Sequence, residues 1–285
     1  MQTTRIKPRT LLVFFLLSTI FISCSLERKI AKSYVKTKEK KSVLVFFPSE
    51  LFKTNLKTYQ ALTDDSLHTL NHDSFLRDNS LFLKFINDSL FMTKCWQSMV
   101  NELGAHGIMV YGFDQINEFL NLKDSSYVIN LAQMQLEEYV HTEKVEADID
   151  GRYYSGDIDL NAINLNAWFE LERNQVPGEK YPVLYSSYYI YDDFEGQFVG
   201  SSSSYAEVNY RYKLDTMQVE DVYNLAELAG KKYAINFYDY LLNIYVQDHL
   251  PKNQVPVFYF HYDRRMKSLQ TYYYDGFTEI DPENN

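Results

Sequence analysis

The sequence is poor in cysteine and glycine, with two cysteines and ten glycines among 285 residues. It contains no glycine-rich phosphate loop, no paired-histidine zinc-protease motif and no serine-hydrolase elbow. These absences exclude the catalytic classes that such motifs identify. We therefore predict a protein that is not an enzyme and that uses no cofactor and no metal.

Three weaker chemical interpretations remain as alternatives. A calcium site around Asp148 and Asp157 lacks the ligand spacing of an EF-hand, and a turn rich in Asp and Gly explains the same residues. His68 and His72 share a face only if their segment is helical, and two ligands do not complete a zinc site. An enzyme of unfamiliar type would need carboxylates such as Asp148, Asp157 and Glu170 to face one cleft.

Positive charge is scarce outside one short stretch. The formal net charge is −10, of which residues 1–26 contribute +3 and residues 27–41 contribute +5, so that the chain from Ser42 onward carries −18. Such an acidic body excludes nucleic acid as a partner, because phosphates would repel it. The basic stretch suits anionic lipid headgroups or serves as a solvated, flexible tether.

The N-terminus has the pattern of a secretory signal. Arg5, Lys7 and Arg9 precede an apolar run over residues 11–22 that is too short to span a bilayer comfortably. We predict a signal peptide at residues 1–23.

Phe21-Ile22-Ser23-Cys24 resembles the lipobox of bacterial lipoproteins, with Phe21 where Leu is more usual. The resemblance implies that Cys24 receives a diacylglyceryl group and, after cleavage, an amide-linked fatty chain such as palmitate. Ser25 is compatible with sorting to the outer membrane, facing the periplasm. The alternative is an ordinary signal in which Cys24 stands by chance. Membrane face and oligomeric state stay open.

If lipid occupies Cys24, Cys95 has no intrachain partner for a disulfide. We expect Cys95 to be buried and therefore inert. The spacing of Phe91, Cys95, Met99 and Leu103 places it on the apolar face of a helix that begins near Asn87.

Hydrophobic periodicity predicts the α+β class, a mostly antiparallel sheet with helices packed on one face, following a signal peptide and a lipidated tether. The predicted domains are a basic tether at 24–41 and a single domain at 42–285, with a closing hairpin at 255–274 and a disordered tail at 279–285. Strands are expected at 42–47, 107–112, 127–140, 163–172, 183–191 and 206–214, and helices at 87–104, 114–122 and from a capping box at 215–218 to 248. The polar segment at 49–80 is expected to be a long loop or a few short helical turns, 148–159 a polar connector and 196–204 a loop.

The last helix carries Ala226, Ala229, Gly230 and Ala234, and these small side chains predict close packing against a sheet. The overall order of elements is similar to that of the auxiliary lipoproteins of ABC transporters and of the lipopolysaccharide-assembly lipoprotein. This resemblance implies a role in envelope assembly or transport through contacts with a partner protein.

Tyrosine is abundant, with 25 residues. Several tyrosines fall on two predicted strands and would form a surface for a partner protein or, alternatively, for a glycan. A core of tyrosines with their hydroxyls at the rim is the competing interpretation. The candidates are Tyr185, Tyr188, Tyr189, Tyr191, Tyr205, Tyr210 and Tyr212.

Asp65-Ser66-Leu67, Asp88-Ser89-Leu90 and Asp215-Thr216-Met217 resemble the short O-glycosylation sequon of Bacteroidota. We expect Ser89 and Thr216 to cap helices. Ser66, in a polar loop, would then be glycosylated first, which intact-mass comparison with Ser66→Ala would test.

Overall fold

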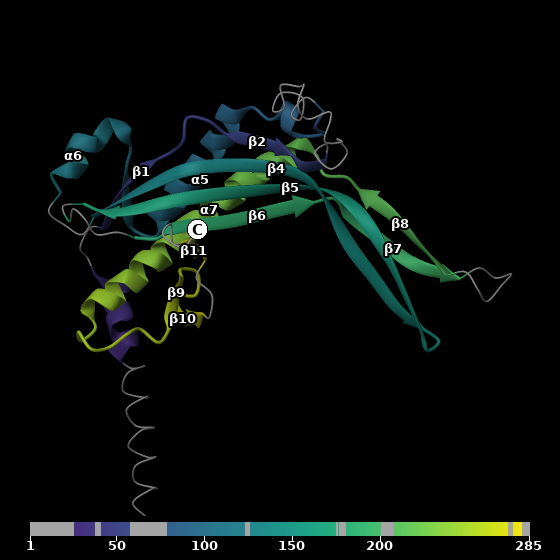
Figure 1. Cartoon of the computed structure of the whole chain (residues 1–285). Helices are drawn as coiled ribbons and strands as arrows, with labels where there is room; N and C mark the ends of the chain where they lie inside the picture. Colours follow the sequence, from purple (N-terminus) through teal and green to yellow (C-terminus); the bar gives the residue numbers. More distant parts are fainter. Residues whose placement is uncertain are drawn as a thin grey trace, which may run out of the picture.

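The computed structural model describes residues 26–37, 41–57, 79–122, 126–174, 176, 181–200, 208–272 and 276–280. The protein is α+β, as predicted. Figure 1 shows a body in which helices cover a sheet, and two hairpins that extend from one side of it. The signal peptide, Cys24, Ser66 and the last five residues lie outside the described residues, so predictions for them stay predictions.

The main sheet has seven strands in the order β11-β6-β5-β4-β1-β3, and β2 pairs with β4. It is mixed: β1 runs parallel to β3 and β4, and β2 runs parallel to β4, whereas β5, β6 and β11 continue the sheet in antiparallel pairs. The strands are β1 (Lys41–Phe46), β2 (Phe52–Asn55), β3 (Ile108–Tyr111), β4 (Ser126–Ile149), β5 (Arg152–Arg173), β6 (Val183–Tyr191) and β11 (Thr278–Ile280). The expected loop at 49–80 therefore contains β2, and the expected disordered tail begins inside β11.

Two long helices, α5 (Asp88–Ala105) and α7 (Val219–His249), lie over one face of this sheet. On the opposite face, a short 3-10 turn, η2 (Phe113–Gln115), leads into α6 (Ile116–Leu120), whose Phe119 packs with Leu44 and Tyr111 in a separate small core. The prediction that helices cover one face is thus wrong for α6. Because β1 is covered on both faces, its sequence is continuously apolar rather than alternating.

The main core lies between the sheet and the two long helices. The alternation predicted for residues 163–172 is confirmed, because Ile163, Leu165 and Phe169 are fully buried on the helix side. Asn87 caps α5 by accepting a hydrogen bond from the backbone of Leu90 at 2.9 Å. Cys95 is buried as predicted, and burial raises the pKa of its thiol to about 12.

Gly230 of α7 allows close packing against a helix rather than against the sheet. A Cβ at Gly230 would collide with the backbone carbonyl oxygen of Cys95 in α5. The two helix backbones therefore meet at Gly230. The predicted contact between this position and the sheet is wrong, because α5 lies there.

The hairpin of β4 and β5 is longer than the sequence predicted. Its strands are joined by Asp150 and Gly151, both with positive φ (53° and 76°), as a tight two-residue turn requires. The polar connector expected at 148–159 is therefore strand almost throughout. The loop expected at 196–204 is likewise strand as far as Gly200, since β7 (Asp193–Gly200) pairs with β8 (Val208–Asp215) in a second sheet.

Residues 26–36 form a helix that docks on the body, so the flexible tether predicted over 24–41 is wrong for this part. Ala31 and Tyr34 are buried, and the Tyr34 ring lies 5.6 Å from that of Tyr238 in α7. The folded unit therefore begins before the predicted boundary at residue 42. No helix in the described parts of the chain is both long and apolar enough to cross a bilayer.

A hairpin of β9 (Tyr259–Asp263) and β10 (Ser268–Tyr272) lies within the range predicted for the closing hairpin, and β11 follows it.

Some helix-capping residues differ from those that the sequence predicted. The backbone of Gln218 donates to Asp221, so the capping interaction of α7 lies three residues beyond the predicted one. Neither Ser89 nor Thr216 caps a helix, and both are exposed, so the reason given for preferring Ser66 is wrong.

Candidate functional site

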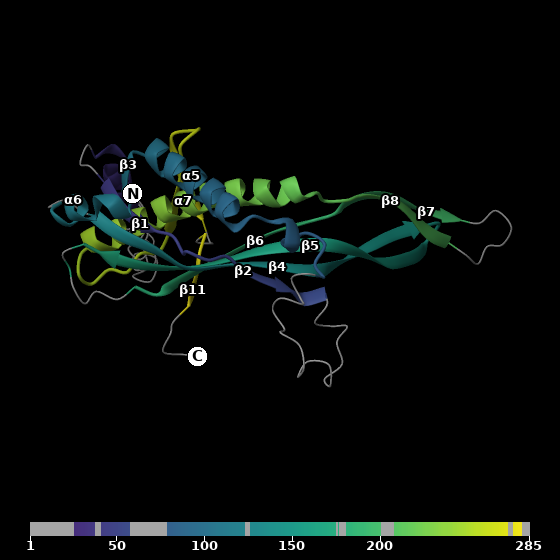
Figure 2. The same cartoon turned by 90° about the horizontal axis from the view of Figure 1, so that it is seen from above.

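The most distinctive feature is an arm that projects from the body. We define the arm as residues 139–162, the distal part of the β4–β5 hairpin, together with the β7–β8 hairpin. Figures 1 and 2 show both hairpins extending away from the helices on the same side. No helix lies over them in either view.

The buried face of β5 changes where the arm leaves the body. Within the body, Ile163 and Leu165 are buried against the helices. Within the arm, Ile158 and Leu160 are buried although they point to the other face. Both Ala162 and Ile163 are fully buried at the crossover. The strand is continuous, but the layer that covers it changes at this point.

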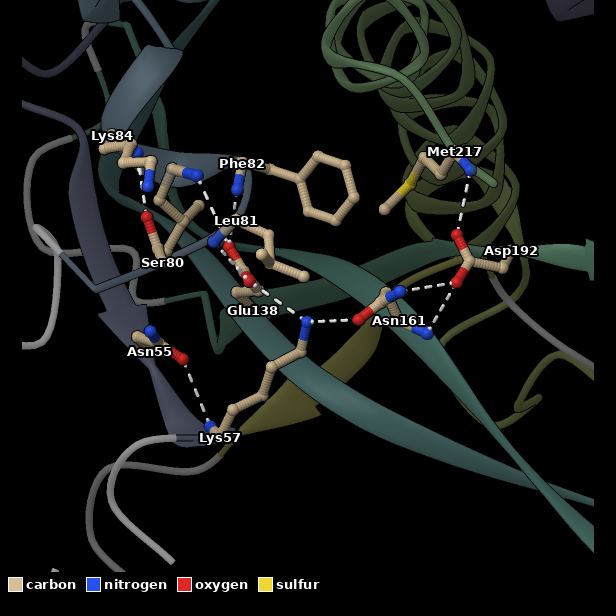
Figure 3. Close-up of polar contacts among 11 residues, drawn as sticks. Asn55, Lys57, Ser80, Leu81, Phe82, Lys84, Glu138, Asn161, Asp192 and Met217 are labelled. Carbon is tan, nitrogen blue, oxygen red and sulfur yellow. Dashed lines mark hydrogen bonds and ion pairs between the residues drawn. The ribbon is translucent and has the colours of Figure 1, made fainter. Parts of the chain in front are cut away.

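A buried polar network, which we call the clasp, occupies this crossover: Glu138, Lys57, Asn161 and Asp192 (Figure 3). The fully buried Glu138 carboxylate accepts hydrogen bonds from Lys57 Nζ at 3.0 Å and from the backbone N–H groups of Leu81, Phe82 and Leu83. The last of these residues begins the short 3-10 helix η1 (Leu83–Phe85). Glu138 thereby satisfies donors that would otherwise be buried without partners.

The other half of the clasp reaches the arm and α7. Lys57 Nζ also donates to Asn161 Oδ1 at 2.7 Å, and Asn161 donates from its backbone and its amide to Asp192 Oδ2. The second carboxylate oxygen of Asp192 accepts from the backbone of Met217, just before α7. A single chain of charge-assisted hydrogen bonds therefore joins the segment that follows β2, strands β4 and β5, the residue before β7 and the start of α7.

The β7–β8 hairpin has one apolar and one polar face. Phe198 packs against Tyr210 with centroids 4.9 Å apart, and it also approaches Tyr154 of β5 at 6.3 Å. Gly196 lies under the Tyr210 ring, where any Cβ would collide with that ring. Tyr212 stacks on Tyr210 but remains 48% exposed. The apolar face is thus only partly covered by the neighbouring hairpin.

A second aromatic group lies on the sheet face opposite to α5 and α7. His141 stacks on Tyr191 at 4.6 Å, and Tyr191 stacks on Tyr189 at 6.0 Å. Ala162 lies between Tyr139 and Tyr191 in the strand register and is fully buried. Tyr189 and Tyr191 remain 58% and 40% exposed, so this row is open to solvent.

The structure divides the tyrosines that the sequence had grouped. Tyr185, Tyr189 and Tyr191 share the open face, and Tyr185 donates to Asn166 Oδ1 at 2.6 Å. Tyr188 points the other way and accepts from Asn236 in α7. Tyr210 and Tyr212 belong to the second sheet, and Tyr205 lies outside the described residues. The prediction of one tyrosine surface is therefore wrong, because alternate side chains of a strand point to opposite faces.

A cavity of about 480 Å³ lies between α5, α7 and the β9–β10 hairpin. Within it, His261 Nδ1 lies 2.5 Å from Asp239 Oδ2, and the other carboxylate oxygen accepts from the backbone of Tyr262. Burial raises the pKa of Asp239, and the hydrogen bond that His261 donates to Asp239 raises the pKa of His261. The described residues lining this cavity include no serine, threonine or cysteine, and the hydroxyls that line it belong to Tyr259 and Tyr262.

The carboxylates considered for acid–base chemistry do not share a cleft. Asp157 and Glu170 lie thirteen residues apart on one strand, which corresponds to about 40 Å. Asp148, at the tip of the hairpin, accepts from the backbone of Gly151 as turn residues do. No three His, Cys, Asp or Glu side chains gather as a metal site within the described ranges, and His68 and His72 lie outside them.

Sequence reasoning missed the clasp, although Glu138 lies in a strand that was predicted and Asp192 directly follows another. A carboxylate at an inward position of a strand is the signal that was available. Neither a scan against models of protein families nor a search of the curated proteins finds a match to this chain.

Proposed function

We propose that this chain is a lipid-anchored protein of the bacterial outer membrane that faces the periplasm, and that it acts without catalysis by binding an envelope protein through its arm. The proposed role is envelope assembly or transport. The lipobox-like sequence at Cys24 supports the anchor. The arm supports binding to another protein.

The observation that carries this proposal is an apolar surface presented on a rigid base. A surface that served only to complete the core would bury its aromatic side chains, yet Tyr212 on the arm, and Tyr189 and Tyr191 on β6 at the base of the arm, are each at least 40% exposed. Exposed tyrosines with few rotatable bonds favour protein interfaces, because little side-chain entropy is lost on binding. The clasp fixes the direction of the arm before any partner binds, which lowers the cost of association.

Site-specific photo-cross-linking in the native membrane tests the partner. A benzophenone amino acid at Tyr212 or Tyr189 should capture the same protein, whereas one at Phe113, which is 75% exposed on the body, should not. An identical adduct pattern at Phe113 and Tyr212, or no adduct at either Tyr212 or Tyr189, would contradict the proposal.

Metabolic labelling with an alkyne palmitate tests the anchor. The native chain should be labelled, and Cys24→Ala should be unlabelled and should keep residues 1–23. Labelling of Cys24→Ala would place the lipid on another residue.

A second candidate, glycan binding, is supported by the open sheet face, where Trp168 and Tyr185 adjoin Asn164 and Asn166. The stacked row favours it less, because His141 and Tyr191 stack at 4.6 Å and each covers one ring face of the other, which a sugar would otherwise contact. Screening a glycan array with the chain from residue 25 onward, which retains the docked helix 26–36, tests this candidate. Binding that is lost in Trp168→Ala would favour it over the first proposal.

A further inference from the structure

We infer that the end of the body formed by the first turn of helix 26–36 and by residues 252–257 rests on the lipid bilayer, with its valines in the headgroup region and its lysines on anionic lipids. This inference rests on the proposed anchor at Cys24 and adds a second, non-covalent contact with the same membrane. The contact would set the direction in which the arm points.

The two segments are joined by specific hydrogen bonds. Glu27, whose side chain is buried, accepts from the backbone N–H groups of Val257 and Phe258 at 3.2 and 3.3 Å. Arg28 donates to the carbonyl oxygen of Leu269 at 3.0 Å. In Figure 1, the segment that leaves α7 passes beside the start of helix 26–36 at the lower end of the body, away from the arm.

The apolar side chains of this end face solvent. Val255 is 81% and Val257 is 69% exposed, and Pro256 lies between them. These are the most exposed aliphatic side chains that the structure describes. Glu27 fixes the backbone at Val257, so the exposure belongs to a defined conformation.

The exposed charged side chains of helix 26–36 and of residues 252–257 are all positive. Of the five exposed residues of helix 26–36, four are cations, and the acidic Glu27 is buried. Lys252 adds a further exposed cation, and residues 250–258 contain no acidic residue. The exposed cations are Arg28, Lys29, Lys32, Lys36 and Lys252. This contrasts with the net charge of −18 carried by the chain from Ser42 onward and suits anionic headgroups.

The position of the proposed anchor indicates that a lipid bilayer covers this end of the body. Cys24 lies two residues before Leu26, and two residues span at most about 7 Å. Acyl chains on Cys24 would be in the hydrocarbon core, so the first helical turn must lie close to the headgroups. Lys29 and Lys32 are within roughly 10 Å of Leu26 along the helix axis, which is about one Debye length at physiological salt.

Depth-dependent fluorescence quenching tests the inference on the full lipidated chain. The buried Cys95 and the acylated Cys24 leave an introduced cysteine as the accessible thiol. Val257→Cys and the control Phe113→Cys would each carry an environment-sensitive dye. Both proteins would be reconstituted into vesicles of phosphatidylethanolamine and phosphatidylglycerol that contain spin-labelled lipid.

We expect a blue shift and loss of most of the emission at position 257, with neither change at position 113. The double variant Lys29→Glu/Lys32→Glu should reduce quenching at 257 in these vesicles, and Lys213→Glu, an exposed change on β8, should not. Equal quenching at the two dye positions, or none at 257, would overturn the inference while leaving the anchor intact. Intact mass of the same sample separates the cases, since a chain without acyl groups would overturn the anchor and the inference together.

Discussion

The two ends of the β4–β5 hairpin have the same secondary structure and different surroundings. In the body, one face of β5 is buried under α5 and α7 by Ile163, Leu165 and Phe169. In the arm, the opposite face is the protected one, and the side chains that cover it are tyrosine, histidine and phenylalanine. The body therefore owes its stability to a closed apolar core, whereas the arm depends on its anchoring at the clasp.

This difference separates stability from binding. Substitutions in the body core should change the free energy of unfolding, and substitutions on the arm surface should change partner capture instead. The clasp lies between the two regions and should affect both. Four substitutions or changes of condition test this distinction.

The largest effect is expected at the clasp. Glu138→Ala would leave Lys57 without its buried partner and three backbone N–H groups without an acceptor. We expect a loss of about 3–5 kcal/mol in the free energy of unfolding, measured by denaturant titration. Amides of residues 139–162 should also exchange faster with deuterium.

The matched control is Glu170→Ala, an exposed carboxylate on the same hairpin that accepts a hydrogen bond from the Asn130 side chain. Its effect should stay within about 0.5 kcal/mol. Equal losses for Glu138→Ala and Glu170→Ala would show that the clasp does not hold the arm.

The contact between α5 and α7 should give the next largest effect. Gly230→Ala raises helix propensity, but its Cβ would collide with the Cys95 carbonyl and separate the helices, at a net cost of about 1–3 kcal/mol. Gly104→Ala in α5 meets no atom within 4 Å and should stabilise by up to about 1 kcal/mol. Thermal denaturation of the two variants would reveal opposite signs. A shift of the same sign would refute the close contact.

A smaller, pH-dependent effect is expected where the closing hairpin meets α7. The folded-state pKa of His261 is raised by Asp239, and that of Asp239 is raised by burial. A raised folded-state pKa means that the folded state binds more protons, so stability falls as the pH rises through it. For His261, this window starts near its ordinary pKa of about 6.5 and extends upward.

The urea midpoint of the native chain should therefore decrease from about pH 6 to about pH 9. The decrease should be shallower in His261→Gln, which keeps a hydrogen-bond donor for Asp239 but does not titrate. Identical pH slopes in both chains would mean that the pair does not stabilise the hairpin.

The smallest effect on stability is expected on the arm surface. Tyr212→Ser removes a ring that is nearly half exposed and should change the unfolding free energy by less than about 0.5 kcal/mol. The same substitution should abolish the cross-link formed from position 189. A large loss of stability with cross-linking retained would reverse our assignment of body and arm.

Several local elements could be predicted because their determinants are close in the sequence. Asn87 and the stripe from Phe91 to Leu103 define α5, and alternation defines the body half of β5. By contrast, the sequence from Asp148 to Asp159 looks like a polar connector because neither face of it is continuously apolar. Its strands form because residues on β4 and β5 pair across the turn at Asp150 and Gly151.

The sequence by itself determined the α+β class, the long helices and the burial of Cys95, since propensity, capping and periodicity act over a few residues. Only the tertiary structure decided which tyrosines share a face and that helix 26–36 docks on the body. It also decided that Lys57 and Asn161 connect Glu138 to Asp192 at the base of the arm. These outcomes depend on contacts between residues up to 241 positions apart, such as Arg28 with Leu269. Local periodicity carries no information about such pairs, because it records only that a side chain is buried and not what covers it.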